Sequence, residues 1–162
     1  MKYFKNKQIK IFALLLSLTF ISSLFSSCSI IHFKSPKVSE IITNIKKNND
    51  LSSLNKSTKS KLRKLYGISY KTLEDFALYI PKTNMEANEL LILKVKNQDD
   101  IDSIKERIEK RIEKQSNTFK DYAPNQYELL ENHILKVKGP YLIFIVSKNA
   151  NNIMININDS FK

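Results

Sequence analysis

Few side chains in the sequence could do nucleophilic, acid–base or metal chemistry. The 162 residues contain one cysteine, Cys28, and two histidines, His32 and His133. A zinc site needs several Cys, His or carboxylate ligands together, and a Ser-His-Asp triad needs a histidine with two partners. His133 precedes an expected strand, where a histidine is typically a surface or edge residue. The sequence therefore predicts no metal site, no cofactor and no histidine-based catalysis.

Two pairs of carboxylates are close enough in sequence for acid–base chemistry: Glu86 with Glu89, and Asp121 with Glu128. Glycosidases place two carboxyl groups on either side of the bond that they cleave. One interpretation of the chain is therefore a small hydrolase acting on cell-wall polymer. The chain has only two glycines, which excludes the glycine-rich phosphate loops of nucleotide-binding proteins. We expect a non-enzymatic interaction or binding module, with the hydrolase as the alternative.

The N-terminal segment has the pattern of a secretory signal. Four lysines within the first ten residues precede Ile11–Phe25, an apolar run without charge. The small residues Ser26 and Ser27 then precede Cys28. This segment resembles the lipobox of bacterial lipoproteins, in which the cysteine receives diacylglycerol and becomes the new N-terminus; Phe25 departs from the usual Leu, Val or Ile. We expect a signal peptide over residues 1–27, lipid attachment at Cys28 and a linker over residues 28–37.

Two alternatives to this leader stay open. The stretch Ile11–Phe33 carries no Asp, Glu, Lys or Arg and is long enough to span a bilayer uncleaved, although its Ser and Thr residues weaken that interpretation. Cys28 could also be incidental. With Cys28 lipidated, the mature chain has no free thiol. Two acyl chains would anchor it stably to the extracytoplasmic face of the cell membrane.

Basic charge is concentrated between Lys34 and Lys64. This segment holds nine basic residues and two acidic ones, whereas from Leu65 onward basic and acidic residues are equal in number. Clustered Lys and Arg gain about 1 kcal/mol each near anionic lipid. The segment therefore fits contact with anionic lipid or wall polymer, and it fits solvated helix faces equally well. No aromatic residues are interleaved with the charges, so we expect no nucleic acid as a partner. A protein partner is expected but not identified.

Helical periodicity dominates the rest of the chain. Two basic helices are expected within residues 38–66, the second ending at Gly67, which suits the left-handed position after a last turn. A long amphipathic helix follows Asp99, with one apolar stripe: Ile101, Ile104, Ile108, Ile112 and Phe119. Pro124 excludes the preceding residue from helical conformation and suits the first position of a short helix reaching Glu131.

Two apolar hairpins flank the long helix. The first joins Phe76–Ile80 to Leu90–Lys96, in which Leu91, Leu93 and Val95 alternate with lysines. The second joins residues 134–138 to residues 141–147 through a tight turn at Gly139. The tail after residue 149 fits a helix or a strand, and we favour a helix. The resulting fold class is α+β: an antiparallel sheet of about four strands from two hairpins, the long helix packed on one face, and additional N- and C-terminal helices.

The break between the two central helices is the candidate interaction surface. It carries Asp121, Tyr122, Gln126, Tyr127 and Glu128, which fall at a helix break rather than on an apolar stripe. The two tyrosines could equally close the edge of the core, with Asp121 capping the short helix. We expect partner contacts here if the domain is a binding module.

The segment around this break also resembles a known family. Phe119–Asn132 (Phe-Lys-Asp-Tyr-Ala-Pro-Asn-Gln-Tyr-Glu-Leu-Leu-Glu-Asn), Asn88-Glu89-Leu90, Arg107 and Arg111 are similar to a domain-of-unknown-function family of small Gram-positive lipoproteins. Pro140 stands where that family's turn has Asn. The resemblance implies a lipoprotein leader, an α+β domain over residues 67–162 and a C-terminal helix. It brings no activity with it.

Overall fold

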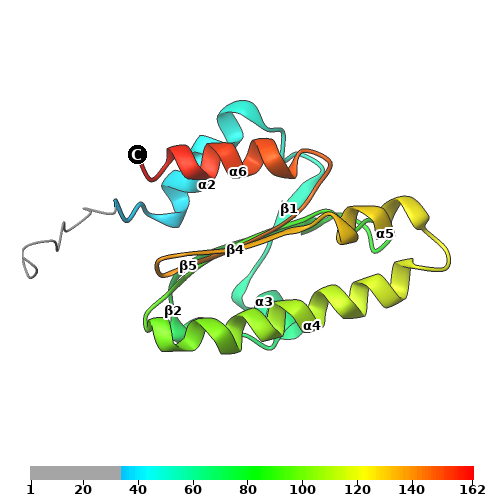
Figure 1. The fold of residues 1–162 in the computed structure, drawn as a ribbon, viewed down its shortest axis with the longest axis horizontal. Coiled ribbons are helices and arrows are strands. Elements are labelled where there is room, and N and C mark those ends of the chain that lie inside the picture. Colours follow the sequence, from blue (N-terminus) through cyan, green and yellow to red (C-terminus); the bar gives the residue numbers. More distant parts are fainter. Residues whose placement is uncertain (1–33) are drawn as a thin grey trace, which may run out of the picture. The chain divides into compact units, whose positions relative to one another are not determined.

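The fold is an antiparallel five-stranded sheet with helices on both faces (Figure 1). A computed structural model describes residues 34–162, so the leader, Cys28 and His32 lie outside the described residues. The strand order is β1-β2-β3-β5-β4. The strands are β1 (Leu54–Lys56), β2 (Leu73–Pro81), β3 (Glu89–Val95), β4 (Ile134–Lys138) and β5 (Tyr141–Val146).

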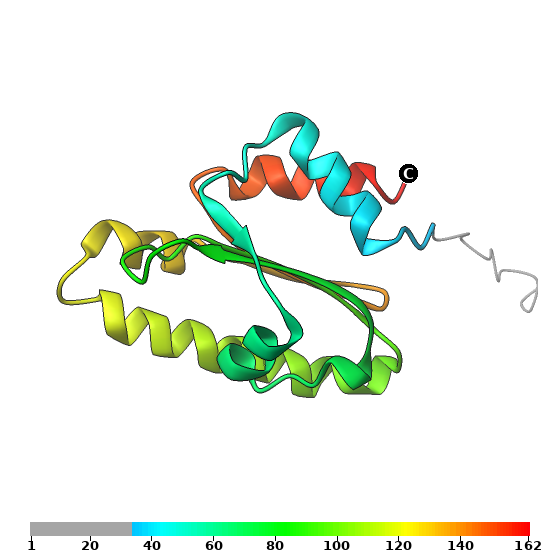
Figure 2. The same ribbon diagram turned by 180° about the vertical axis from the view of Figure 1, so that it is seen from behind.

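The helices form a layer on each side of the sheet (Figures 1 and 2). One layer contains α2 (Val38–Asn48) and α6 (Ala150–Asp159), and the other contains α3 (Lys59–Tyr66), α4 (Ile101–Phe119) and α5 (Pro124–Glu131). Short 3-10 turns, η1 (Tyr70–Thr72) and η2 (Gln98–Asp100), precede β2 and α4. The α+β class is confirmed, as are the long helix and the two terminal helices.

The two central strands separate two apolar clusters. All six residues of β5 are buried, as its continuous apolar run indicates. In β3, Leu91, Leu93 and Val95 face α4, as expected, but Leu90 and Ile92 are also buried, against the α2–α6 layer. The predicted alternation therefore holds for Leu91, Leu93 and Val95, and the opposite face of β3 is buried as well. Of the two lysines in the predicted alternation, Lys94 lies near the end of β3 and Lys96 follows the strand.

The sheet has five strands rather than about four because β1 was missed. This three-residue strand pairs with the end of β2, Leu54 lying opposite Pro81. It contains one apolar residue and two polar ones, so it shows no alternation from which a strand could be predicted. The first hairpin is also longer than expected, since β2 begins at Leu73.

Local signals placed the helix boundaries correctly. Gly67 follows α3 with a φ of 68°, and Gly139 in the β4–β5 turn has a φ of 54°. Pro124 is the first residue of α5. The tail is helical, with Ile153 and Ile157 buried against the sheet. No helix among residues 34–162 is long and apolar enough to cross a membrane.

Residues 34–162 form one compact unit in which α2 and α3 pack on the same sheet as the later elements. We call one end of this unit the near end: residues 34–37, the β4–β5 turn and residues 159–162. Tyr141 joins these segments, donating a hydrogen bond to the Pro36 carbonyl (2.6 Å) and stacking edge-on against Phe161. The opposite end, the far end, consists of residues 82–88 and 119–126 (Figure 1).

Candidate functional site

The predicted interaction surface lies at the far end. Asp121, Tyr122 and Glu128 are exposed there, and Tyr122, at 52% exposure, is among the most exposed large apolar side chains of the described residues. Its ring lies 5.8 Å from that of Phe119, the last buried residue of α4. Tyr127 is partly buried against the α4-side core. The helix break thus presents one exposed aromatic ring, Tyr122, and uses the other to close the core.

Gln126 connects this surface to the β2–β3 connection. Its side-chain oxygen accepts a hydrogen bond from the Ala87 backbone N–H at 2.8 Å. The same connection carries Met85, which is 64% exposed. No side-chain hydrogen bond caps the start of α5, so none is made there by Asp121. Gln126 therefore has a structural role, and Met85 is an exposed apolar residue of the far end that the sequence did not single out.

The most strongly buried charges form a cluster between β3 and α4. The Glu89 side chain is fully buried and accepts a fork of hydrogen bonds from Arg111, Nη2 to Oε2 at 2.7 Å and Nε to Oε2 at 3.1 Å. The Tyr66 hydroxyl donates to Glu89 Oε1 at 2.5 Å, and the Arg111 guanidinium lies over the Tyr66 ring. These charge-assisted hydrogen bonds tie the buried carboxylate of β3 to both α3 and α4.

The charges within this cluster shift the ionisation of its members. Burial raises the pKa of Tyr66 well above its ordinary value, and the neighbouring Glu89 charge raises it further. Burial disfavours the Arg111 cation, but attraction to Glu89 outweighs that effect, so the pKa of Arg111 is raised. Near neutral pH, Tyr66 therefore stays neutral and Arg111 stays charged. The cluster joins α3, β3 and α4 and acts as a structural bridge.

The carboxylate pairs proposed for hydrolysis are arranged unequally. Glu86 and Glu89 both line a far-end hollow of about 460 Å³, together with Asp50, but the Glu89 carboxylate is paired with Arg111. Hydrogen bonds from the Ser52 side chain and backbone N–H hold the pKa of Asp50 below its ordinary value. A general acid needs a raised pKa. Asp121 and Glu128, the second pair, are both exposed.

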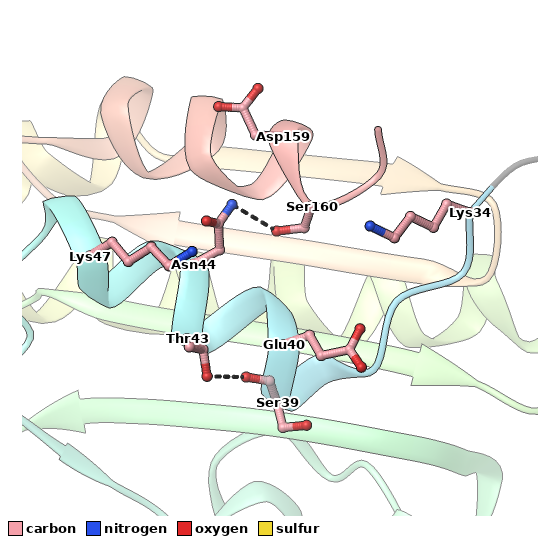
Figure 3. Close-up of a pocket in the computed structure, with 8 residues that line it drawn as sticks. All are labelled: Lys34, Ser39, Glu40, Thr43, Asn44, Lys47, Asp159 and Ser160. Carbon is pink, nitrogen blue, oxygen red and sulfur yellow. Dashed lines mark hydrogen bonds between the residues drawn. The ribbon is translucent and has the colours of Figure 1, made fainter.

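A second hollow, of about 400 Å³, lies between α2 and the end of α6 (Figure 3). Its polar groups are largely bonded to one another: Asn44 donates to the Asn156 carbonyl at 2.8 Å and to Ser160 Oγ at 3.2 Å. Lys34 and Lys47 on its rim are balanced by Glu40 and Asp159. These contacts fasten α6 to α2, and the arrangement offers no group poised for chemistry.

The basic segment is divided between the two helix layers. Lys37, Lys46 and Lys47 belong to the α2 side, while the basic residues of α3 lie on the opposite face of the sheet (Figures 1 and 2). His133 precedes β4, partly buried, with its ring 5.9 Å from that of Phe144. Residues 34–162 contain no group of three or more His, Cys, Asp or Glu placed to hold a metal ion.

The described residues form a small α+β domain with a buried Glu89–Arg111 ion pair and an exposed Tyr122 ring at its far end. Residues 47–147, more than half of the chain, match the family described as Domain of unknown function (DUF4358), and the chain belongs to this family. Comparison with curated proteins gave no match, and comparison with solved structures gave none. The expected domain-of-unknown-function membership is therefore confirmed.

The buried cluster was not predicted from the sequence, although a signal for it exists. Arg111 and Gln115 continue the spacing of Ile108 and Phe119 in steps of three, four and four, so both lie on the core side of α4. Polar residues on an apolar stripe must find partners in the interior. The predicted apolar stripe of α4 has no member between Ile112 and Phe119, and Gln115 lies between these two residues.

Proposed function

We propose that the protein is a lipoprotein, anchored through Cys28 to the extracytoplasmic face of the membrane, whose domain is a non-enzymatic interaction module. The observation that carries the proposal is that the chain enters the domain at one end and exposes two large apolar side chains together at the opposite end. The chain enters at the near end, only six residues after Cys28. Of the five exposed large apolar residues among residues 34–162, Met85 and Tyr122 lie together at the far end, and Tyr70, Val137 and Ile155 lie singly elsewhere.

Chain length supports the anchoring part of the proposal. An extended chain spans at most about 3.6 Å per residue, so Lys34 is within roughly 20 Å of a lipid on Cys28. The near end is then held beside the bilayer. This narrows the expected contact with anionic lipid to Lys34 and Lys37, because these are the residues of the basic segment that belong to the near end. The far end is left to meet partners in the surrounding space.

Binding is favoured over hydrolysis by the state of the carboxylates. A retaining or inverting glycosidase needs one carboxyl group with a raised pKa and a second that is free to act as nucleophile or base. Glu89 is committed to Arg111 and Tyr66, and the pKa of Asp50 is lowered. Asp121 and Glu128, the second pair, are both exposed to solvent.

The mass of the intact protein recovered from the membrane fraction tests the anchor. We expect a polypeptide that begins at Cys28 and carries diacylglycerol. The Cys28→Ser variant is the matched control, since it changes one atom of the acceptor and should keep residues 1–27 without lipid. A wild-type mass that still includes Met1–Ser27 would instead indicate an uncleaved span and contradict the proposal.

A further inference from the structure

A third hollow, of about 440 Å³, lies at the far end beside the exposed Tyr122. It is lined by the end of β2 and the following connection, by α3 and by the C-terminal half of α4. Leu65, Ile80 and Phe119 make part of its lining apolar. None of the five residues of the predicted surface lines the hollow, but the ring of Phe119, which does, packs against that of Tyr122.

The hollow contains an unsatisfied acceptor. Gln115 lines it, and the Oε1 atom of this side chain is buried without a hydrogen-bond partner, the one buried side-chain N or O atom among residues 34–162 of which this is true. Leaving a buried polar group unpaired is costly. The Oε1 atom is itself closed to solvent, so a ligand N–H would remove this cost after the Gln115 side chain rotates toward the hollow.

The charges at the rim favour an anionic ligand. Lys61 of α3 and Lys114 of α4 are exposed there, and among the described residues neither ammonium makes an ion pair. Arg111 also lines the hollow, but Glu89 already neutralises its charge. Glu86 is the acidic residue of the lining. Two unpaired cations thus oppose one carboxylate, beside an apolar wall.

We propose that this hollow binds a short extended segment of a partner protein in which an acidic residue adjoins an apolar side chain. The apolar side chain would cover the partly exposed Leu65 and Ile80, the carboxylate would meet Lys61 and Lys114, and a backbone N–H would donate to Gln115. A lipid headgroup fits less well, because the hollow is at the far end, away from the anchoring residues. A linear polyanion also fits less well, because it would leave the apolar lining uncovered and would place negative charge beside the Glu86 carboxylate.

This inference rests on the interaction module proposed above and names its ligand. The test is selection of a random heptapeptide phage library on the full chain in non-ionic detergent micelles. We expect enriched sequences that pair Asp or Glu with Leu, Ile or Phe. A synthetic peptide from the leading clone should bind the double variant Lys61→Gln/Lys114→Gln at least tenfold more weakly than the wild type.

The matched control is Lys64→Gln/Lys105→Gln, which removes the same charge from the same two helices outside the hollow. We expect its affinity to stay within twofold of the wild type. Gln115→Leu should weaken binding at least fivefold while the protein remains folded. Two competitors examine the other ligand classes: a glycerol-phosphate oligomer and phosphatidylglycerol vesicles, neither of which should displace the peptide at matched negative charge.

Several results would overturn the assignment. These are no enrichment, enriched peptides without acidic residues, equal weakening by both double variants, or displacement by the oligomer or the vesicles. Peptides that bind elsewhere on the domain would refute the hollow and leave the interaction module standing. The anchor is tested separately by the intact mass, so failure of one proposal is distinguishable from failure of the other.

Discussion

Replacing Glu89 with glutamine should destabilise the domain severely, although the change alters only one atom of the side chain. Glu89 is fully buried and the Arg111 side chain is 12% exposed. Glu89→Gln would leave the guanidinium without its counter-ion and turn an amide NH2 group toward its donors. Removing one partner of a buried pair typically costs about 3–5 kcal/mol. That is a large fraction of the about 5–15 kcal/mol by which domains are stable.

Urea denaturation of the full chain in non-ionic detergent, followed by circular dichroism, measures this loss. The transition midpoint should fall while the m-value stays constant, because the surface exposed on unfolding is unchanged. The control is Glu106→Gln on α4, the helix that carries Arg111. The Glu106 carboxylate is exposed to solvent and pairs with Lys110 at 3.2 Å. An exposed pair of this kind contributes about 0.3–0.5 kcal/mol.

A second variant separates charge from packing. Glu89→Leu/Arg111→Leu, made in a Tyr66→Phe background so that no buried hydroxyl loses its acceptor, removes both charges. It should be close to wild type in stability, since paired buried charges often gain little over apolar residues of similar volume. The reasoning is refuted if Glu89→Gln costs no more than Glu106→Gln. It is also refuted if the double variant is as unstable as Glu89→Gln, because the loss would then come from packing rather than from an uncompensated charge.

Three further predictions concern the same part of the domain. The pKa of Tyr66 is raised in the folded state, so its contribution to stability is complete below about pH 10 and is lost as pH rises through the folded-state pKa. The difference in free energy of unfolding between wild type and Tyr66→Phe should therefore shrink by about 1.4 kcal/mol between pH 8 and pH 11. Gly67→Ala should lower the free energy of unfolding by about 1–2 kcal/mol, because φ is 68° and the new Cβ would lie 3.1 Å from the Arg107 Nη1 atom; Gly67→Asn should cost less in the same urea titration. Gln115→Leu should raise the free energy of unfolding by about 1–3 kcal/mol by removing an unpaired buried acceptor, and an unchanged urea midpoint would contradict that account.

Local chemistry predicted much of this fold because local rules determine it. The proline at the start of α5, the glycine after α3 and the positive φ at Gly139 follow from the backbone preferences of single residues. The apolar stripe of α4 was also correct, with Ile104, Ile108 and Phe119 buried. These features need no knowledge of distant contacts, so a single sequence was sufficient.

Features that depend on pairing across the chain were not predictable in the same way. The β1 strand exists because β2 offers it a free edge, and nothing in residues 54–56 requires a strand. The second buried face of β3 depends on α2 and α6, whose positions the strand's own pattern does not specify. Similarly, Glu89 and Arg111 are 22 residues apart and are brought together only when α4 crosses the sheet. An interaction role for Tyr122 was expected from the helix break, whereas Met85 is singled out only by its exposure and Gln115 only by its place in the lining of a hollow.

The buried ion pair and the proposed binding hollow are not independent, because Arg111 belongs to both. Glu89 fixes the guanidinium in a two-pronged hydrogen bond, and the Tyr66 ring packs against it, so one wall of the hollow is rigid before any ligand arrives. Preorganisation of this kind lowers the entropy that binding must overcome. The same pairing removes Arg111 as a source of charge for the ligand, which leaves attraction to the exposed Lys61 and Lys114. Affinity at the hollow should therefore depend on salt as exposed charges do, while the wall that supports it remains insensitive to salt.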